Sequence, residues 1–329
     1  MHLGHPENTG KGRGALTKTI PVLAGPTGAG KTNLIASMDP DRFEIVSLDS
    51  RQIYKHLSIG TAAPDARILR RIPHHLVGFL DPDQSFTAME YRELALEAIQ
   101  DILSRKRIPL MAGGAGFYLQ VLMTGPFEFE EDPGIVEQVR SMSPEERLTL
   151  LSRKDPHCIV HPGEQPGEGR IHPNDAYRVE RYLIMVLTSG MTMSELWTRK
   201  RKEESEQEFD FAGFFLFPGE ETLWKNLRIR AETMVRDGLI QEAVECRERF
   251  GSNCPGLQIL GYPEALACAD GKLSEEELVE KLWIVHRQYA RRQRIWFQKR
   301  QYVRFVDSLD VHTLETAAAN LFSGLGINH

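Results

Sequence analysis

One stretch of eight residues, GPTGAGKT at positions 25–32, constrains the fold more than any other part of this chain. It matches the phosphate-loop pattern G-x-x-x-x-G-K-[ST] at every fixed position. An apolar run at residues 20–24 precedes it, as expected of a short buried strand, and a helical stretch opens at Lys31. In such a loop the backbone N–H groups and the following helix surround a phosphate. The stretch therefore predicts an α/β protein that binds a di- or triphosphate.

The whole loop is expected to contact the diphosphate or nucleotide, with Lys31 charged against the terminal phosphates and the Thr32 hydroxyl binding Mg²⁺. The residues of this predicted site are Gly25, Pro26, Thr27, Gly28, Ala29, Gly30, Lys31 and Thr32. A chance glycine turn is the alternative, but it does not explain the strand before the loop and the helix after it. The motif does not identify the group that is transferred.

Composition excludes several classes of protein. The 329 residues are 41% hydrophobic and 26% charged, as in ordinary globular proteins. The net charge of −6 means that any binding of nucleic acid must use a local basic face. No apolar run is long enough to span a membrane, and the amino-terminal residues lack the core of a signal peptide. Because no two of the four cysteines have C-x-x-C spacing, we expect a cytoplasmic protein with reduced thiols, monomeric by default.

Strand and helix patterns alternate along the chain, which predicts a parallel sheet flanked by helices. Apolar runs at residues 43–48, 108–112 and 211–217 are expected to be buried strands, and residues 76–80 form a further apolar run. Thr87 and Glu90 have the spacing of a capping box, which opens a helix ending near residue 105. We expect His74 and His75 to have a structural role at a strand edge.

Asp49 follows the run at 43–48, so it should lie at the same edge of the sheet as the phosphate loop, where ligands of α/β sheets bind. Three interpretations remain open from its position alone. It is a helix cap or turn residue, it holds Mg²⁺ through water, or it takes part in the chemistry.

The chain is expected to divide into four segments. Residues 1–19 read as a disordered tail, and residues 20–126 as the first part of a P-loop NTPase-like core. Residues 127–208 contain no buried-strand pattern, so they predict a helical insertion domain. Residues 209–329 complete the core.

The last segment carries a basic helix at residues 286–300, in which arginines alternate with aromatic residues and no acid occurs. This pattern suits phosphate contact and base stacking, so it favours binding of nucleic acid. The alternative is a solvated charged face that packs on the core through Tyr289 and Trp296.

Taken in order, these motifs resemble the tRNA dimethylallyltransferases, also called tRNA isopentenyltransferases. The resemblance covers most of the chain, and its parts are GPTGAGKT, Asp49-Ser50-x-Gln52-x-Tyr54, Gly60-Thr61-Ala62, Pro73-His74-His75, Gly113-Gly114-x-Gly116-x-Tyr118, His172-Pro173-Asn174-Asp175 with Arg178, Leu260-Gly261-Tyr262-x-Glu264, and Ala290-Arg291-Arg292-Gln293 with Trp296. The phosphate loop alone is common to many nucleotide-binding proteins, whereas the ordered set is specific.

The resemblance implies transfer of a dimethylallyl group from dimethylallyl diphosphate to the exocyclic amine of the adenosine 3′ to a tRNA anticodon. It assigns Asp49 as the base that accepts the amine proton, Arg230 as a ligand of the diphosphate, and Mg²⁺ as the cofactor. The insertion domain would clasp the anticodon stem-loop, and the adenine would leave its stack to reach the site. The implied tRNA-binding residues are Asp49, Ser50, Arg51, Gln52, Ala115, Tyr177, Arg178, Val179, Glu180, Arg181, Gln258, Gly261, Tyr262, Arg291, Arg292, Gln293 and Trp296.

This chain departs from the family pattern at several positions. Ala115 stands where the family usually has Thr, which removes a hydroxyl worth about 1–3 kcal/mol if it bonds in the transition state. Other departures are Ala63, Pro263, His286, Ile295 and Gln298. Two other functions therefore stay open: a P-loop kinase of small molecules, and a homologue that binds tRNA without full activity.

Overall fold

The computed structural model of the chain describes residues 18–125, 131–160, 170–203 and 209–324. The chain divides into two compact units, one of residues 1–125 with 208–329 and one of residues 126–207. Both ends of the second unit lie one residue before the ends expected for the insertion, 127 and 208. The expected tail of residues 1–19 lies outside the described residues except for Lys18 and Thr19, which belong to a strand instead. The first unit is the core and the second is the insertion, and each is described by itself.

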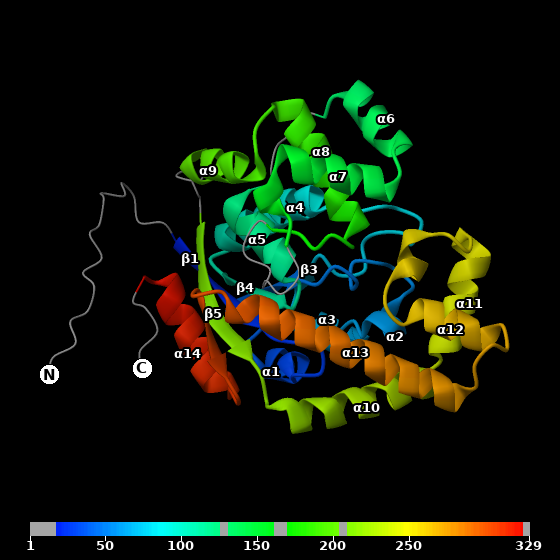
Figure 1. The fold of residues 1–329 in the computed structure, drawn as a ribbon. Coiled ribbons are helices and arrows are strands. Elements are labelled where there is room, and N and C mark those ends of the chain that lie inside the picture. Colours follow the sequence, from blue (N-terminus) through cyan, green and yellow to red (C-terminus); the bar gives the residue numbers. More distant parts are fainter. Residues whose placement is uncertain (1–17, 126–130, 161–169, 204–208, 325–329) are drawn as a thin grey trace, which may run out of the picture. The chain divides into compact units, whose positions relative to one another are not determined.

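The core is built on one six-stranded sheet in which every pair of neighbouring strands is parallel, in the order β3-β2-β4-β1-β5-β6 (Figure 1). The strands are β1 (Lys18–Ala24), β2 (Phe43–Leu48), β3 (His74–His75), β4 (Ile108–Gly113), β5 (Phe209–Leu216) and β6 (Val303–Val306). The expected parallel sheet is therefore confirmed. The short strand β6 was not anticipated from the sequence.

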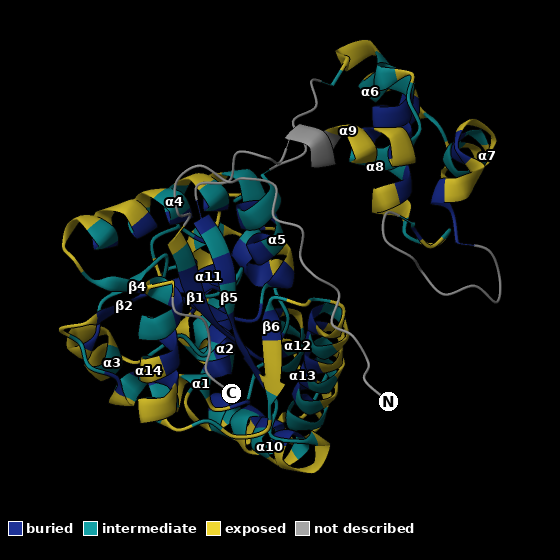
Figure 2. Ribbon diagram, turned by 90° about the vertical axis from the view of Figure 1, so that its left-hand side faces the viewer, coloured by how far each residue is buried: buried dark blue, intermediate teal, exposed yellow. Residues whose placement is uncertain are grey.

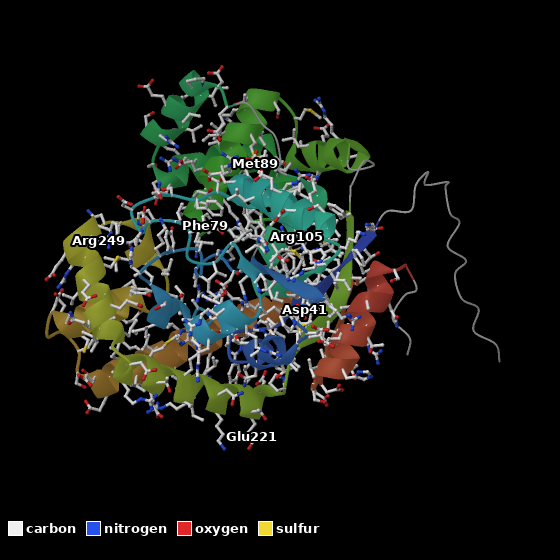
Figure 3. All side chains as sticks on the ribbon, turned by 180° about the vertical axis from the view of Figure 1, so that it is seen from behind. Asp41, Phe79, Met89, Arg105, Glu221 and Arg249 are labelled. Atoms are coloured by element: carbon white, nitrogen blue, oxygen red, sulfur yellow. The ribbon has the colours of Figure 1, made fainter. Side chains whose placement is uncertain are left out.

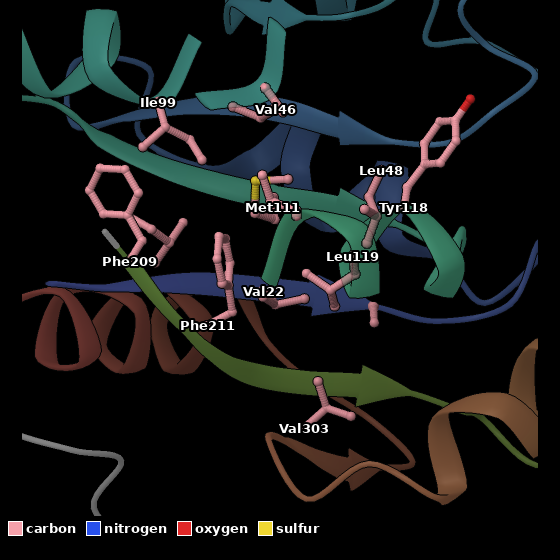
Figure 4. Packing of buried hydrophobic residues seen from close by; sticks show 14 of the residues in the cluster. Val22, Val46, Leu48, Ile99, Met111, Tyr118, Leu119, Phe209, Phe211 and Val303 are labelled. Atoms are coloured by element: carbon pink, nitrogen blue, oxygen red, sulfur yellow. The ribbon is translucent and has the colours of Figure 1, made fainter. Parts of the chain in front are cut away.

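Each strand sends alternate side chains to opposite faces of the sheet, and helices cover both faces. On one face Val46 and Leu48 of β2 join a cluster with α4 (Ala88–Ser104) and α5 (Gly116–Thr124), seen in Figure 4. On the other face Phe43 and Ile45 pack with α1 (Lys31–Ser37), α3 (Ala66–Arg71) and α14 (Val311–Phe322). The central strands are accordingly almost entirely buried, and dark blue in Figure 2. The Thr87–Glu90 capping box of α4 is confirmed.

A second cluster of buried residues lies among helices that follow β5. These are α10 (Glu220–Arg236), α11 (Leu239–Phe250), the 3-10 helix η3 (Pro255–Gln258), α12 (Tyr262–Ala269) and α13 (Glu275–Gln298). The long helix α13 runs beside α10 in Figure 1. The short helix α2 (Ser58–Thr61) packs against α11.

The insertion is helical, as expected. Its elements are α6 (Pro133–Ser141), α7 (Pro144–Lys154), the 3-10 helix η1 (Pro156–Cys158), α8 (Ala176–Ser189) and α9 (Met193–Glu203). Val139, Leu151 and Leu183 are buried in a core of its own. Within residues 131–160 and 170–203 the only β pairing is an isolated bridge between Ile159 and Ile171.

The region around the paired histidines differs in part from expectation. Residues 76–80 form no strand, because Leu76 takes a left-handed conformation with a φ of 63° directly after β3. The strand-edge role of the histidines is confirmed, since Nε2 of His75 lies 2.7 Å from the buried carboxylate of Glu44. Arg105, labelled in Figure 3, donates to the same carboxylate over 2.8 Å. Burial raises the pKa of Glu44, but these hydrogen bonds outweigh it and leave the pKa below its usual value.

Among the residues that the structure describes, no helix combines the length and the apolar character needed to cross a bilayer.

Candidate active site

The ends of three neighbouring strands bring the predicted site residues together. In the sheet Gly113 is paired with both Ala24 and Leu48, so the turns that follow β1, β2 and β4 meet at one edge. A pocket of about 470 Å³ opens there. Residues lining it include Thr27, Gly28, Ala29, Gly30, Lys31, Thr32, Asp49, Gln52, Gly113, Gly114, Asn226, Arg230 and Gln293. Of the sequence-predicted residues, loop residues 27–32, Asp49, Gln52, Arg230 and Gln293 therefore line one pocket, whereas Gly25 and Pro26 do not line it.

The phosphate loop keeps its shape through its glycines. Gly28 and Gly30 have φ values of 79° and 96°, which side chains of L residues rarely allow. At Gly25 a Cβ would lie 2.8 Å from the backbone oxygen of Leu216, so only glycine fits beside β5. The ammonium of Lys31 folds over the loop and donates to the carbonyl groups of Gly25 and Pro26 at 2.8 and 2.9 Å.

The pocket concentrates positive charge that its own residues only partly balance. Burial lowers the pKa of Lys31 to about 8, with Arg230 adding to this effect and Asp49 opposing it. Burial likewise lowers the pKa of Arg230 to about 10, again opposed by Asp49. Burial makes the charged forms of Lys31 and Arg230 less stable than they are in water. An anion bound in the pocket would offset that cost, so the pocket favours anionic ligands.

Arg230 is placed in the pocket by α10. Its Nη2 atom donates weakly to the carbonyl of Thr61 over 3.5 Å, and its buried Nε atom has no hydrogen-bond partner among the described residues. Asn226, one helical turn earlier, donates to the carbonyl of Gly28 over 3.0 Å and also lines the pocket. Asn226 was missed from the sequence, although its i, i+4 spacing from Arg230 places both on one face of the helix.

Of the interpretations left open for Asp49, the structure shows the turn role. Its Oδ1 atom accepts from the backbone N–H groups of Arg51 at 2.9 Å and Gln52 at 3.4 Å, so it does stabilise the turn after β2. The same side chain lines the pocket that contains Lys31 and Arg230. Among the described residues, the hydrogen bonds that Asp49 accepts go to its Oδ1 atom and none goes to Oδ2.

Gln52 and Arg51 are held by residues distant in the sequence. The amide of Gln52 donates to the carbonyl of Ala62 over 3.0 Å. The guanidinium of Arg51 lies 3.6 Å from the ring centre of Tyr289 on α13, and that of Arg292 lies 5.8 Å from it. Tyr289 thus orients a cation beside Asp49. Ser50 is half-buried and does not line the pocket.

Two further residues of α13 face inward. Gln293 is buried and its amide donates to the carbonyl of Gly114 over 3.0 Å. Trp296 packs against α5, where a Cβ on Gly116 would lie 2.2 Å from its ring. The alternative in which this helix packs on the core through its aromatic residues is therefore correct for Trp296.

The basic side of α13 is only partly free to meet nucleic acid. Arg287 lies over the ring of Trp283 at 4.4 Å, and Arg294 forms an ion pair of 2.7 Å with Glu220. Both thus serve the packing of the core. Arg291 and Arg292 are exposed.

Ala115 occupies the N-cap position of α5, at the edge of the site. No side-chain hydrogen bond caps this helix, because alanine offers no acceptor. The backbone N–H groups of Gly114 and Ala115 both donate to the carbonyl of Leu48, which fixes the turn against β2.

The other residues implied in tRNA binding divide into exposed and buried ones. Gln258 is exposed on η3, whereas Tyr262 has no exposed surface.

In the insertion, Tyr177, Arg178 and Arg181 are exposed on α8, with Arg181 paired to Glu131. Val179 is buried in the core of that unit, and Glu180 accepts from Arg147. Side-chain contact with tRNA is therefore not supported at Tyr262 and Val179, which fill cores. Gly261, with a φ of 103°, precedes α12.

The residues present fit a magnesium ion bound together with a diphosphate. Thr32 and Asp49 supply oxygen atoms to the pocket, the ligand type that Mg²⁺ prefers. No group of three or more His, Cys, Asp or Glu that could hold a metal occurs among the described residues.

The parallel sheet, the loop after β1 and the charged pocket define an α/β enzyme with a P-loop-like core. Comparison with known proteins makes the class more specific. The chain belongs to the IPP transferase family, whose model matches residues 52–300.

Relatives and solved structures agree with this assignment. The chain is 39% identical over 299 residues to a tRNA dimethylallyltransferase of Leptospira interrogans, covering 89% of this chain and 96% of the relative. With that of Bacillus subtilis the identity is 31%, covering 92% and 95%. A tRNA isopentenylpyrophosphate transferase from Staphylococcus epidermidis matches with a TM-score of 0.65 and 28% identity, over 93% and 99% of the two chains. A eukaryotic dimethylallyltransferase acting on tRNA matches with a TM-score of 0.79 and 25% identity, over 95% and 81%.

Proposed function

We propose that this protein transfers a dimethylallyl group from dimethylallyl diphosphate to N6 of the adenosine that follows the anticodon in tRNA. The observation that carries the proposal is the shared pocket, in which a carboxylate, Asp49, lies with the cations Lys31 and Arg230. In this arrangement the loop and the two cations can bind a diphosphate leaving group, and the carboxylate beside them can accept a proton. Membership of the IPP transferase family supports the identity of both substrates.

The diphosphate binds in the phosphate loop, where Lys31 and Arg230 balance its charge. The amine nitrogen of adenine attacks the first carbon of the prenyl group as the bond from that carbon to the diphosphate oxygen breaks. The loop and the two cations stabilise the negative charge that grows on the diphosphate. Thr32 would hold a Mg²⁺ ion, which would supply further positive charge against the diphosphate. Asp49 accepts the proton that the amine loses, through the oxygen that the turn does not use.

The base reaches the pocket after leaving its stack in the anticodon loop. Exposed basic residues, Arg291 and Arg292 on α13 and Arg178 on α8, supply contacts to the phosphates of the anticodon stem-loop. The protein acts in the cytoplasm as a monomer.

A transfer assay tests the proposal. Purified protein, Mg²⁺, labelled dimethylallyl diphosphate and unmodified tRNA with adenosine after the anticodon are mixed, and the product is digested to nucleosides. Label on adenosine is the expected result. No label with retained tRNA binding would replace the proposal by a role in binding alone. No label and no binding of tRNA would overturn it, and turnover of ATP with a small acceptor would then indicate a kinase.

A further inference from the structure

The carboxylate of Glu242, on α11 and outside the pocket, gathers hydrogen bonds from a short turn in the first half of the chain. It accepts from the backbone N–H of Ile59 at 2.9 Å and from that of Gly60 at 3.0 Å. The hydroxyl of Ser58 donates to it over 3.3 Å. A single side chain therefore satisfies the first N–H groups of α2, which would otherwise lack partners.

Tyr262 completes the arrangement from α12. Its buried hydroxyl donates to Glu242 over 2.6 Å. Burial, followed by the neighbouring Glu242 carboxylate, raises the pKa of Tyr262, so the hydroxyl stays protonated and remains a donor. A Cβ at Gly60 would lie 2.5 Å from the Tyr262 ring, so the contact requires glycine at position 60.

The far end of the same turn faces the pocket. The carbonyl of Ala62 accepts from the amide of Gln52 at 3.0 Å, and that of Thr61 accepts from Arg230 at 3.5 Å. Ala62 holds a left-handed conformation with a φ of 46°, unusual for a residue other than glycine. The position of these two carbonyls therefore depends on how firmly the turn is held at its other end.

We propose that Glu242 and Tyr262 are positioning residues, which hold the turn of residues 58–62 so that it orients Arg230 and Gln52 towards the diphosphate. This inference rests on the proposed function, since it takes the diphosphate as the ligand of Arg230. It assigns a role to two sequence motifs, Gly60-Thr61-Ala62 and Gly261-Tyr262, other than direct contact with tRNA.

Binding of inorganic diphosphate with Mg²⁺, measured by calorimetry, tests this role apart from catalysis. Tyr262→Phe removes one oxygen atom, and we expect it to weaken binding about fivefold, with Glu242→Gln about tenfold. In the transfer assay KM for dimethylallyl diphosphate should rise by similar factors, while KM for tRNA stays unchanged. The matched control is Asp270→Asn, because Asp270 joins α11 to α12 through Arg247 at 2.7 Å without touching the turn. It should bind diphosphate as the wild type does.

A double-mutant cycle separates positioning from general loss of structure. If Tyr262 acts through Arg230, the effect of Tyr262→Phe on diphosphate binding should fall below about twofold in an Arg230→Gln background. An undiminished effect in that background would overturn the proposal. Circular dichroism verifies that each variant folds, and if Glu242→Gln does not, Tyr262→Phe alone carries the test.

The outcomes distinguish this inference from the function on which it rests. Wild-type affinity in both variants, with diphosphate binding intact, would remove the positioning role and leave the proposed function standing. Absence of diphosphate binding in the wild type would remove the proposed function and the positioning role together.

Discussion

The side-chain oxygen of Gln293 accepts a hydrogen bond of 3.1 Å from the backbone N–H of Thr27, 266 residues earlier in the chain. The amide of the same side chain donates to the carbonyl of Gly114. One residue of α13 therefore joins the phosphate loop to the turn after β4. The basic helix is a structural part of the pocket, whatever its outer face contacts.

Gln293→Met should lower the free energy of unfolding by about 2–4 kcal/mol, because it keeps the volume and leaves a donor and an acceptor without partners. Urea unfolding measures the change. Gln298→Met is the control, since the same substitution falls on an exposed residue of the same helix and should change stability by less than about 0.5 kcal/mol. Equal losses in the two variants would contradict the bridging role.

Asp49→Asn should reduce turnover by a factor of about 10²–10⁴, the range of a general base, because an amide accepts no proton. Diphosphate affinity should change little, since the amide oxygen still accepts from the turn and Lys31 is untouched. Single-turnover assays and calorimetry measure the two effects. Asp41→Asn, at an exposed residue labelled in Figure 3, serves as the control. Wild-type turnover in Asp49→Asn would exclude Asp49 from the mechanism.

Ala115→Thr should stabilise the protein by about 1 kcal/mol, because a hydroxyl at the N-cap of α5 accepts from an N–H of the first helical turn. The transfer rate should also rise if the reaction lacks this hydroxyl. Thermal unfolding and initial rates test the two effects. Ala115→Val adds similar bulk without an acceptor, so a gain in both variants would assign the effect to packing.

Diphosphate binding should weaken as the pH rises above about 8, the pKa to which burial lowers the Lys31 ammonium. Below this pH the lysine is a cation that attracts the ligand, and above it the amine is neutral. Arg230, with a pKa of about 10, keeps its charge over the same range. Calorimetry between pH 6.5 and pH 9 gives the profile. Because the ligand titrates too, the informative quantity is the difference from Lys31→Met, and identical profiles would refute the assignment.

Stability should fall in weak acid because of His286. Burial, with Arg230 and Arg51 nearby, lowers the pKa of this imidazole from 6.5 to about 3. Below pH 6.5 the unfolded chain takes up a proton that the folded protein refuses, so the free energy of unfolding decreases until the pH approaches 3. At pH 5 the loss from this one group is about 2 kcal/mol relative to pH 7. Urea unfolding at both pH values should show a smaller loss in His286→Gln, and an equal loss would disprove this source.

The parts of the fold that depend on local pattern were predictable. Glycine spacing predicts the loop, an apolar run predicts β2, and a capping box predicts the start of α4. Each of these signals lies within a few consecutive residues. The rule that ligands bind at the carboxyl ends of parallel strands also predicts Asp49 beside the loop, and both line the same pocket.

Contacts between distant parts of the chain were not predictable in the same way. Tyr262 belongs to a motif that in the family implies contact with tRNA. The identity of the residue does not show whether its ring is exposed or, as here, buried against Gly60. The stacking of Arg51 on Tyr289 and the capping of α2 by Glu242 likewise depend on how helices pack. Strand β6 has only four residues, so its alternation of apolar and polar side chains is too short to be recognised after the basic segment that precedes it.

The order of strands has a consequence during synthesis of the chain. One neighbour of β1 is β5, and their register pairs Lys18 with Phe209, which leaves the ribosome 191 residues later. At usual translation speeds this interval lasts about 10–40 seconds. Throughout it, one side of β1 has N–H and C=O groups without their final partners, and the whole insertion emerges before β5 does. The nascent protein therefore passes through a stage with an open strand edge, at which a chaperone would protect it from aggregation.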